Sequence, residues 1–201
     1  RATPLMVDGI LYAPNAVGLV EAFNPGTGET VWVQQPYDND PRSYRGAATR
    51  GVAYWADGDE ERIIVQRGEW MYALHPKTGE LFRDFGDNGR VDLTTGLSEG
   101  ARYRWGSAPT VVRDVIVLGQ SMSDTFVTKE DIRGDVRAFD VRTGELRWLF
   151  HTIPQAGEFG TDSWGDNSWE FSGHAPVWSL FAADEDLGYV YMPTSSATND
   201  M

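Results

Sequence analysis

Three copies of one short pattern constrain the fold of this chain more than any other feature of its sequence. In each copy an apolar run leads into a polar turn, a Thr-Gly pair follows, and an aromatic residue stands on the expected returning strand. The glycine can take a positive φ, which a tight hairpin with a bulge requires. The pattern therefore predicts three β-hairpins, and the copies read AFNPGTGETVW (22–32), ALHPKTGELF (73–82) and AFDVRTGELRW (138–148).

The side chains of these copies fit the same interpretation. Asn24 and Asp140 can accept hydrogen bonds from the turn backbone, and the Thr hydroxyl can do the same. Trp32 and Trp148 offer a large flat face for packing against a neighbouring unit. The first residues of the three copies are 51 and 65 residues apart. A hairpin repeated at this spacing indicates a propeller or a solenoid, because one unit cannot bury its own apolar face.

A second kind of hairpin lies before each copy, which gives four strands per unit. Two apolar runs flank Asp8-Gly9 in PLMVDGILYAP (4–14), and two flank Arg113-Asp114 in APTVVRDVIVLGQ (108–120). Similar pairs occupy 51–66 and 175–194. Units of four short antiparallel strands fit a propeller blade better than a solenoid coil. The expected strand starts of the units are Thr3, Arg50, Ser107 and Ala175.

The sequence therefore predicts an all-β fold: one domain over residues 1–201, with about three and a half four-stranded propeller blades. Because a propeller must close to protect its edges, we expect the chain to be a fragment of a longer protein, truncated at both ends. Between the units, residues 34–49, 84–106 and 150–173 are expected to be irregular insertions, which are either functional loops or plain connections.

Composition excludes several classes of function. The formal net charge of −13 argues against a nucleic-acid partner, because phosphate binding needs basic patches. Cysteine is absent, which excludes disulfides, iron–sulfur clusters and thiol catalysis. No apolar stretch approaches the length of a transmembrane helix. The usual hydrolase motifs are absent as well, so the residues alone leave the reaction type open.

A resemblance to a known protein family narrows the possible reaction types. The three hairpins resemble the tryptophan-docking motif of the PQQ-dependent (quinoprotein) dehydrogenases, which are eight-bladed propellers around pyrroloquinoline quinone. Three longer stretches are similar to the branch that contains the membrane-bound glucose dehydrogenase: TRGVAYW (49–55), DIRGDVRAFDVRTGELRWLFHTIP (131–154) and APVWSLFAADEDLGYVYMPTSSATND (175–200). The resemblance implies oxidation of a sugar or alcohol by hydride transfer to PQQ, assisted by Ca²⁺ or Mg²⁺. It also implies ubiquinone or cytochrome c as electron acceptor, and a periplasmic location with any membrane association outside this chain.

The resemblance also implies which residues bind the cofactor. Arg50 matches an arginine that contacts a quinone carboxylate, a role that suits a planar guanidinium. Trp178 matches the tryptophan that stacks under the quinone ring. Gly106 and Ser107 fall at the cofactor edge. Each has a plainer interpretation beside it: a surface ion pair for Arg50, a docking residue between blades for Trp178, and the start of a strand for Gly106 and Ser107.

Two further positions match the metal shell of the family. Asp124 falls where the glucose-type branch places a metal-binding acid, and Thr198 falls near another ligand position; a carboxylate is a suitable hard ligand for Ca²⁺. A solvated loop aspartate is the alternative for Asp124. The aspartate that serves as general base is expected beyond Met201, so no catalytic residue is assigned here and the chain alone is expected to be inactive.

Differences from the family pattern leave the identity of the substrate undetermined. Two alternative functions also remain. Residues 44–48 lack the cysteine pair of the alcohol-oxidising branch, and Gly46 stands where the glucose-type branch has a histidine. One rival is a non-enzymatic propeller that serves as an outer-membrane assembly scaffold. The other is a sensor domain that keeps the fold without binding the cofactor.

Overall fold

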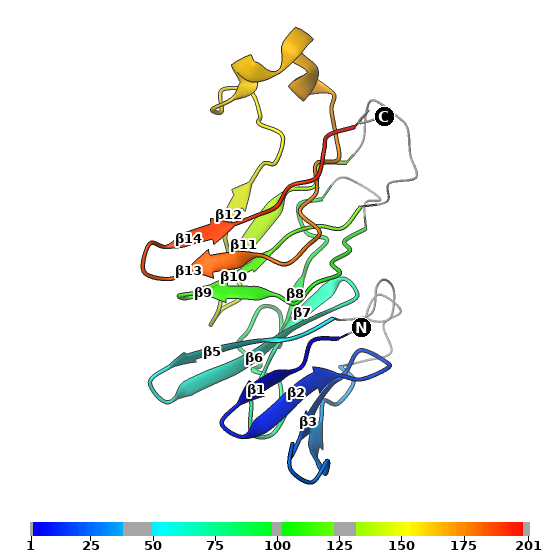
Figure 1. The fold of residues 1–201 in the computed structure, drawn as a ribbon, viewed down its shortest axis with the longest axis vertical. Helices are drawn as coiled ribbons and strands as arrows, with labels where there is room; N and C mark the ends of the chain where they lie inside the picture. The colour runs from blue at the N-terminus through cyan, green and yellow to red at the C-terminus, as the bar shows by residue number, and fades with distance from the viewer. Residues whose placement is uncertain (1, 38–49, 98–101, 123–131, 199–201) are drawn as a thin grey trace.

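The computed structural model describes residues 2–37, 50–97, 102–122 and 132–198. These residues form three four-stranded antiparallel sheets and one two-stranded sheet, stacked in chain order (Figure 1). Each sheet is a meander of consecutive strands. The predicted all-β fold, a portion of a β-propeller with three full blades and the first half of a fourth, is confirmed.

The strands are short and lie close to the predicted runs. The first sheet contains β1 (Leu5–Val7), β2 (Ile10–Pro14), β3 (Val20–Phe23) and β4 (Thr30–Val33). The second contains β5 (Ala53–Asp57), β6 (Glu60–Arg67), β7 (Trp70–Leu74) and β8 (Arg90–Asp92). The third contains β9 (Thr110–Val112), β10 (Val115–Leu118), β11 (Val136–Asp140) and β12 (Leu146–Phe150). The last pairs β13 (Ala182–Asp184) with β14 (Tyr189–Tyr191).

The Thr-Gly hairpins fold as their turn chemistry predicts. Gly28, Gly79 and Gly144 have φ of 76°, 72° and 74°. In the third hairpin, the Asp140 carboxylate accepts hydrogen bonds from the backbone N–H groups of Arg142 (2.9 Å) and Thr143 (2.8 Å). The strand register shifts between Ala138 and Phe139, as a bulge requires, and it shifts at the same place in the first hairpin.

The second copy departs from the prediction on its returning side. Leu81 forms only an isolated bridge with Leu74, and the fourth strand is β8, from a segment expected to be irregular. Phe82 does not stand on a returning strand; it stacks on His75, with ring centroids 3.7 Å apart. The copy is one residue shorter than the others, and a one-residue shift turns a side chain to the opposite face of a strand. Sequence similarity alone therefore misplaced this aromatic residue.

Neighbouring sheets are joined through the hairpins. The indole N–H of Trp32 donates to the carbonyl of Pro76 (2.7 Å), and the indole ring covers Gly79 of the next unit. A Cβ on Gly79 would lie 2.4 Å from the Trp32 ring. The predicted packing of Trp32 against a neighbouring unit is confirmed. Trp148, its equivalent in the third hairpin, is 37% exposed within the described part of the chain.

This geometry predicts that replacement by alanine destabilises the fold to different degrees at two glycines of the same motif. Gly28 and Gly79 share a positive φ, but nothing lies within 4 Å of a Cβ on Gly28. Gly28→Ala should lower the free energy of unfolding by about 1 kcal/mol through backbone strain alone. Gly79→Ala should cost about 1 kcal/mol more, because the Trp32 ring must move. Urea unfolding of both variants measures the difference, and equal costs would contradict the docking of Trp32.

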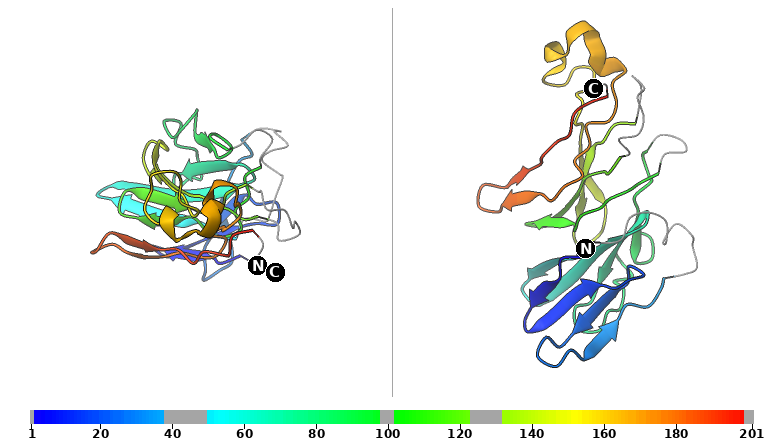
Figure 2. Two further views of the ribbon diagram at one scale, coloured as in Figure 1. Left: turned by 90° about the horizontal axis from the view of Figure 1, so that it is seen from above. Right: turned by 45° about the vertical axis from the view of Figure 1, so that its right-hand side comes forward.

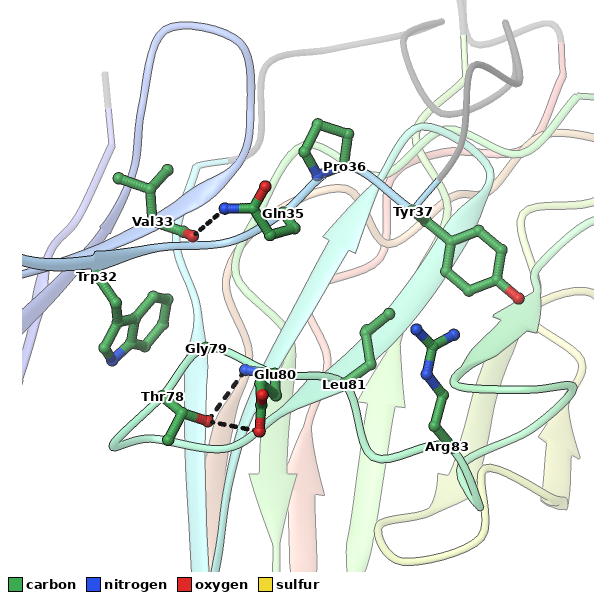
Figure 3. Close-up of a pocket in the computed structure, with 10 residues that line it drawn as sticks. All are labelled: Trp32, Val33, Gln35, Pro36, Tyr37, Thr78, Gly79, Glu80, Leu81 and Arg83. Atoms are coloured by element: carbon green, nitrogen blue, oxygen red, sulfur yellow. Dashed lines mark hydrogen bonds between the residues drawn. The ribbon is translucent and has the colours of Figure 1, made fainter.

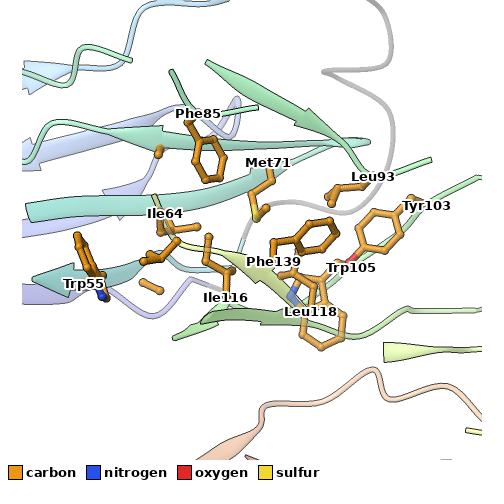
Figure 4. Packing of buried hydrophobic residues seen from close by; sticks show 13 residues of the cluster. Trp55, Ile64, Met71, Phe85, Leu93, Tyr103, Trp105, Ile116, Leu118 and Phe139 are labelled. Carbon is orange, nitrogen blue, oxygen red and sulfur yellow. The ribbon is translucent and has the colours of Figure 1, made fainter. Parts of the chain in front are cut away.

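Buried apolar side chains fill the spaces between the sheets. The largest cluster joins the second and third sheets and includes Trp55, Met71, Trp105, Ile116 and Phe139 (Figure 4). A second cluster, around Val20, Trp32 and Tyr72, joins the first and second sheets. Each sheet thus buries one face against its neighbour, which is how propeller blades share a core.

The segment predicted as the insertion 150–173 contains two short 3₁₀ helices, η2 (Thr161–Ser163) and η3 (Gly165–Glu170). The two helices stand apart from the sheets at one end of the molecule (Figures 1 and 2), whereas Phe150 ends β12 and Ile153 is buried. Among the described residues, no helix is long and apolar enough to cross a membrane.

An ionic network connects the second and third sheets. The buried Arg62 pairs with Glu60 (2.6 Å) and donates to the backbone oxygen of Arg142 (3.1 Å). The Arg142 guanidinium itself pairs with Asp57 (2.5 Å), Glu60 (3.3 Å) and Asp114 (3.0 Å). Hydrogen bonding from Arg62, above all, lowers the pKa of the Glu60 carboxyl.

We therefore expect Glu60→Gln to change the pH dependence of stability. A lowered folded-state pKa stabilises the fold above the unfolded pKa of glutamate, about 4.3, and this stabilisation is lost as the pH falls through the folded value. The variant should be about 1 kcal/mol less stable than the parent near pH 7, and the gap should close in acid. Glu145→Gln, at an exposed hairpin position, is the control. A gap that persists unchanged at pH 3 would refute this assignment.

Candidate functional site

The predicted starts of the units converge in the structure. The backbone N–H of Thr3 donates to the carbonyl of Arg50 (2.7 Å), and Thr3 forms a parallel bridge with Gly51. A Cβ on Gly51 would lie 2.9 Å from the Cβ of Ala108, which opens the third unit. Strand β5 lies beside β9, and β9 beside β13. The starts of successive blades therefore lie side by side, on the edge of each sheet that faces the central axis in a closed propeller.

Arg50 and Gly106 lie together at this axis. Arg50 is exposed, and its guanidinium carbon lies 3.9 Å from the position that a Cβ on Gly106 would take. The same position is 3.6 Å from the hydroxyl of Ser121. Because Gly106 has no side chain, the space in front of the guanidinium is left open.

Trp178 is joined to the same place through Ser107. The Ser107 hydroxyl donates to the backbone oxygen of Trp178 (3.2 Å), and the N–H of Gln120 donates to the oxygen of Val177 (3.2 Å). The third sheet thus fixes the backbone of Trp178, while the residue remains 54% exposed. An exposed indole on an anchored backbone can accept a stacking partner.

The structure therefore brings the four residues assigned to the cofactor into one chain of contacts: Arg50 to Gly106, Ser107 and Trp178. All four residues lie just before the first strands of their units. Their roles stay a prediction, because position alone does not show binding.

The structure describes only one of the two residues predicted to bind a metal ion. Asp124 lies outside the described residues. Thr198 is held against Gly173: its N–H donates to the oxygen of Gly173 (3.1 Å), and its hydroxyl accepts from the N–H of Gly173 (3.2 Å). Within the ranges that the structure describes, no group of three or more histidine or acidic residues could hold a metal ion. The assignment of Asp124 and Thr198 as ligands therefore stays a prediction.

Ser121 is a neighbour of the site that the sequence interpretation missed. The hydroxyl of Ser121 lies 3.6 Å from the position that a Cβ on Gly106 would take. The N–H of Ser121 donates to the oxygen of Arg104 (2.7 Å), which is shifted by two residues from the register that pairs Thr110 with Val117 in β9 and β10. Counting outward from the Arg113-Asp114 turn places Ser121 near this segment but misses the shift.

A large cleft elsewhere holds none of the predicted site residues. It has a volume of about 710 Å³ and lies between the first sheet and the second Thr-Gly hairpin (Figure 3). Trp32 lies on one side, and Thr78, Gly79 and Glu80 form the opposite turn. The cleft belongs to the junction between two blades rather than to the axis. Its lining residues are Trp32, Val33, Gln35, Pro36, Tyr37, Thr78, Gly79, Glu80, Leu81 and Arg83.

Sheets of four consecutive antiparallel strands that pack face to face, with Trp32 of one sheet on the Thr-Gly turn of the next, are the architecture of a β-propeller. The family model "Glucose/ethanol/alcohol dehydrogenase, beta-propeller domain" for PQQ proteins matches residues 1–201, and the chain belongs to this family.

Named relatives agree with this placement. The chain is 28% identical to quinohemoprotein alcohol dehydrogenase ADH IIB of Pseudomonas putida, over 98% of this chain and 28% of that protein. It is 27% identical to quinoprotein glucose dehydrogenase A of Acinetobacter calcoaceticus, over 100% of this chain and 27% of that protein. Among solved structures, quinohemoprotein alcohol dehydrogenase ADHIIG of Pseudomonas putida superposes with a TM-score of 0.73 at 25% identity, over 98% of this chain and 28% of that one.

Proposed function

We propose that the protein containing this chain is a PQQ-dependent dehydrogenase that oxidises a sugar or an alcohol. The single observation that supports this most strongly is that the Arg50 guanidinium lies beside Gly106 and that the next residue, Ser107, bonds the backbone of Trp178, in a chain of the quinoprotein family. When bound, PQQ supplies the electrophilic carbonyl that accepts a hydride from the substrate.

The residues present fit the shape and charge of this cofactor. PQQ is planar and carries carboxylates; the exposed Arg50 guanidinium can bind a carboxylate with two parallel hydrogen bonds. Gly106 lets the edge of a flat ring approach the backbone, because no side chain fills that space. The exposed indole of Trp178 can stack on one face of the cofactor and exclude water there, while Ser107 holds the backbone of Trp178 in place.

The finer parts of the proposal rest on the family resemblance. Asp124 and Thr198 are the proposed contributions of this chain to a Ca²⁺ or Mg²⁺ site, since oxygen ligands suit these ions. A general-base aspartate would come from a part of the protein beyond residue 201. The proposed electron acceptor is ubiquinone or cytochrome c, and the proposed location is the periplasm.

Reconstitution of the full-length protein tests this function. Titration with PQQ and Ca²⁺ should produce a saturable quench of tryptophan fluorescence, and the holoprotein should reduce an artificial dye with glucose or ethanol. A sensor would bind PQQ weakly or not at all and give no turnover. A scaffold would bind neither cofactor nor substrate and would instead retain assembly partners. Failure to bind PQQ at micromolar concentration in the presence of Ca²⁺ would overturn the proposal.

A further inference from the structure

The chain takes an unfavourable backbone conformation just before Trp178. His174 and Ala175 have φ of 66° and 50°, so both lie in the left-handed region. Neither residue is glycine, and an L-residue in this region places its Cβ too close to a carbonyl oxygen. Pro176 follows, and the residue before a proline is normally driven to an extended φ of about −120°. Ala175 therefore departs from two backbone preferences at once.

Residues 132–134 hold this left-handed pair from one side. The N–H of His174 donates to the oxygen of Ile132 (2.8 Å), and the N–H of Gly134 donates to the oxygen of His174 (2.7 Å). A Cβ on Gly134 would lie 2.3 Å from the Cα of Pro176, so the glycine lets the two backbones meet. The segment around Pro176 therefore cannot relax toward residues 132–134.

Residues 195–198 hold the pair from the other side. The N–H of Ala175 donates to the oxygen of Ser196 (3.0 Å), and the N–H of Ser195 donates to the oxygen of Pro176 (2.9 Å). A strained backbone persists only where the surrounding structure fixes it, and residues of this kind cluster at functional sites. The bonds on both sides therefore keep Ala175 in a conformation that it would otherwise leave.

The predicted site residue that follows this pair is Trp178. Its side chain is 54% exposed, so core packing does not hold the indole and its place depends on the backbone that carries it. That backbone is fixed further by the bonds from Gln120 to Val177 and from Ser107 to Trp178, each 3.2 Å long. The constrained backbone thus runs from the left-handed pair to the indole without a break.

We propose that the left-handed pair, His174 and Ala175, is a positioning element that sets the place of the Trp178 indole. The pair acts through the backbone of Trp178 and not by contact with the cofactor. Its effect on PQQ affinity rests on the proposed function, whereas its effect on the indole does not. A pair that relaxed to an extended conformation would redirect the chain before Trp178 and remove the indole from its stacking position.

Fluorine NMR of the full-length protein labelled with 5-fluorotryptophan tests the effect on the indole. The Trp178 resonance is assigned by its loss in Trp178→Phe. Glycine adopts a positive φ without strain, so Ala175→Gly should leave this resonance in place and raise the urea midpoint. A β-branched residue strongly disfavours a positive φ, so Ala175→Val should shift the resonance and lower the urea midpoint.

Titration of the same variants with PQQ measures the consequence for the cofactor. Ala175→Val should weaken PQQ binding about threefold to tenfold, the loss that corresponds to one aromatic stacking contact, and Ala175→Gly by less than about twofold. In a Trp178→Ala background, Ala175→Val should cause almost no further loss, because the two residues act as a unit. An equal loss in both backgrounds would show that the pair does not act through Trp178.

Two control variants separate this role from a general loss of stability. Asn88 is exposed, lies outside the candidate site and has a φ of 53°, so Asn88→Val introduces similar strain elsewhere. It should lower the urea midpoint but leave the Trp178 resonance and PQQ affinity unchanged. Ala156→Gly, at an exposed alanine outside the left-handed region, measures the ordinary destabilisation caused by glycine.

A second valine variant keeps the test decisive if Ala175→Val does not fold. Ala175 is 5% exposed, so valine there can also crowd its neighbours, whereas His174→Val replaces a larger side chain. A Trp178 resonance that the valine variants leave unshifted overturns the proposal. Destabilisation by Ala175→Gly equal to that by Ala156→Gly also overturns it. If the parent does not bind PQQ, the proposed function fails, and the fluorine spectra still decide the role of the pair.

Discussion

Replacing Arg50 by glutamine in the full-length protein is expected to weaken PQQ binding by about tenfold to a hundredfold. A guanidinium can bind a quinone carboxylate through charge-assisted hydrogen bonds, each worth about 1.5–3 kcal/mol, and glutamine keeps some length but loses the charge. Arg50 is exposed, so the same substitution should change the free energy of unfolding by less than about 0.5 kcal/mol. Fluorescence titration with PQQ and urea unfolding measure the two effects separately.

Two further variants test whether the loss of PQQ affinity is due to the guanidinium of Arg50. Arg50→Lys keeps the charge without the planar fork, so it should bind PQQ more tightly than Arg50→Gln but less tightly than the parent. Arg147→Gln removes a partly exposed arginine from the third hairpin, where it pairs with Asp140 (3.0 Å), and should leave PQQ affinity unchanged. Equal affinity of Arg50→Gln and the parent would show that Arg50 does not contact the cofactor.

The turns could be predicted from the sequence because their chemistry is local. Asp8 and Gly9 both take positive φ (47° and 80°), and Arg113 takes 48° at the equivalent turn of the third sheet. Each pair sits between two apolar runs, which is enough to locate a two-residue hairpin without tertiary information. In the first and third sheets the strands then follow from the turns, and so does the count of four strands.

Strand β8 could not be predicted in this way. It has three residues, Arg90–Asp92, and lies well beyond the Thr-Gly turn of its unit. Its place in the sheet depends on pairing with β7, and its packing depends on the close approach of Val91 to Gly144 of the next unit. These are contacts between parts that are distant in the sequence, and no local pattern encodes them. Phe82 was misplaced for a different reason: its copy of the pattern is one residue shorter than the other two, and a one-residue shift turns a side chain to the opposite face of a strand.

The candidate site was predictable only through the family resemblance. Arg50, Gly106 and Trp178 come from three different units, and no spacing between them suggests a shared cluster. Their proximity follows from the contacts of β9 with β5 and β13, which bring the starts of three units side by side. Asp124 lies outside the described residues, so the structure does not test the predicted metal-binding residues as a group.

The largest loss of stability is expected from Gly119→Ala. A Cβ at this position would lie 2.1 Å from the backbone oxygen of Val177 and 2.5 Å from the ring of the buried Trp105. Neither neighbour can move freely, because one is backbone and the other is packed in the core. We expect the free energy of unfolding to fall by about 4 kcal/mol, near the upper end for a single substitution.

The same substitution should also weaken PQQ binding, because Val177 directly precedes Trp178. Pushing the backbone of Val177 away from Gly119 would displace the indole that is proposed to cover the quinone. Gly165→Ala is the matched control: nothing lies within 4 Å of a Cβ there, and its φ is outside the left-handed region. Urea unfolding and PQQ titration of both variants provide the test. If Gly119→Ala proves as stable as Gly165→Ala, the close approach of the third sheet to residue 177 is wrong, and with it the anchoring of Trp178 at the axis.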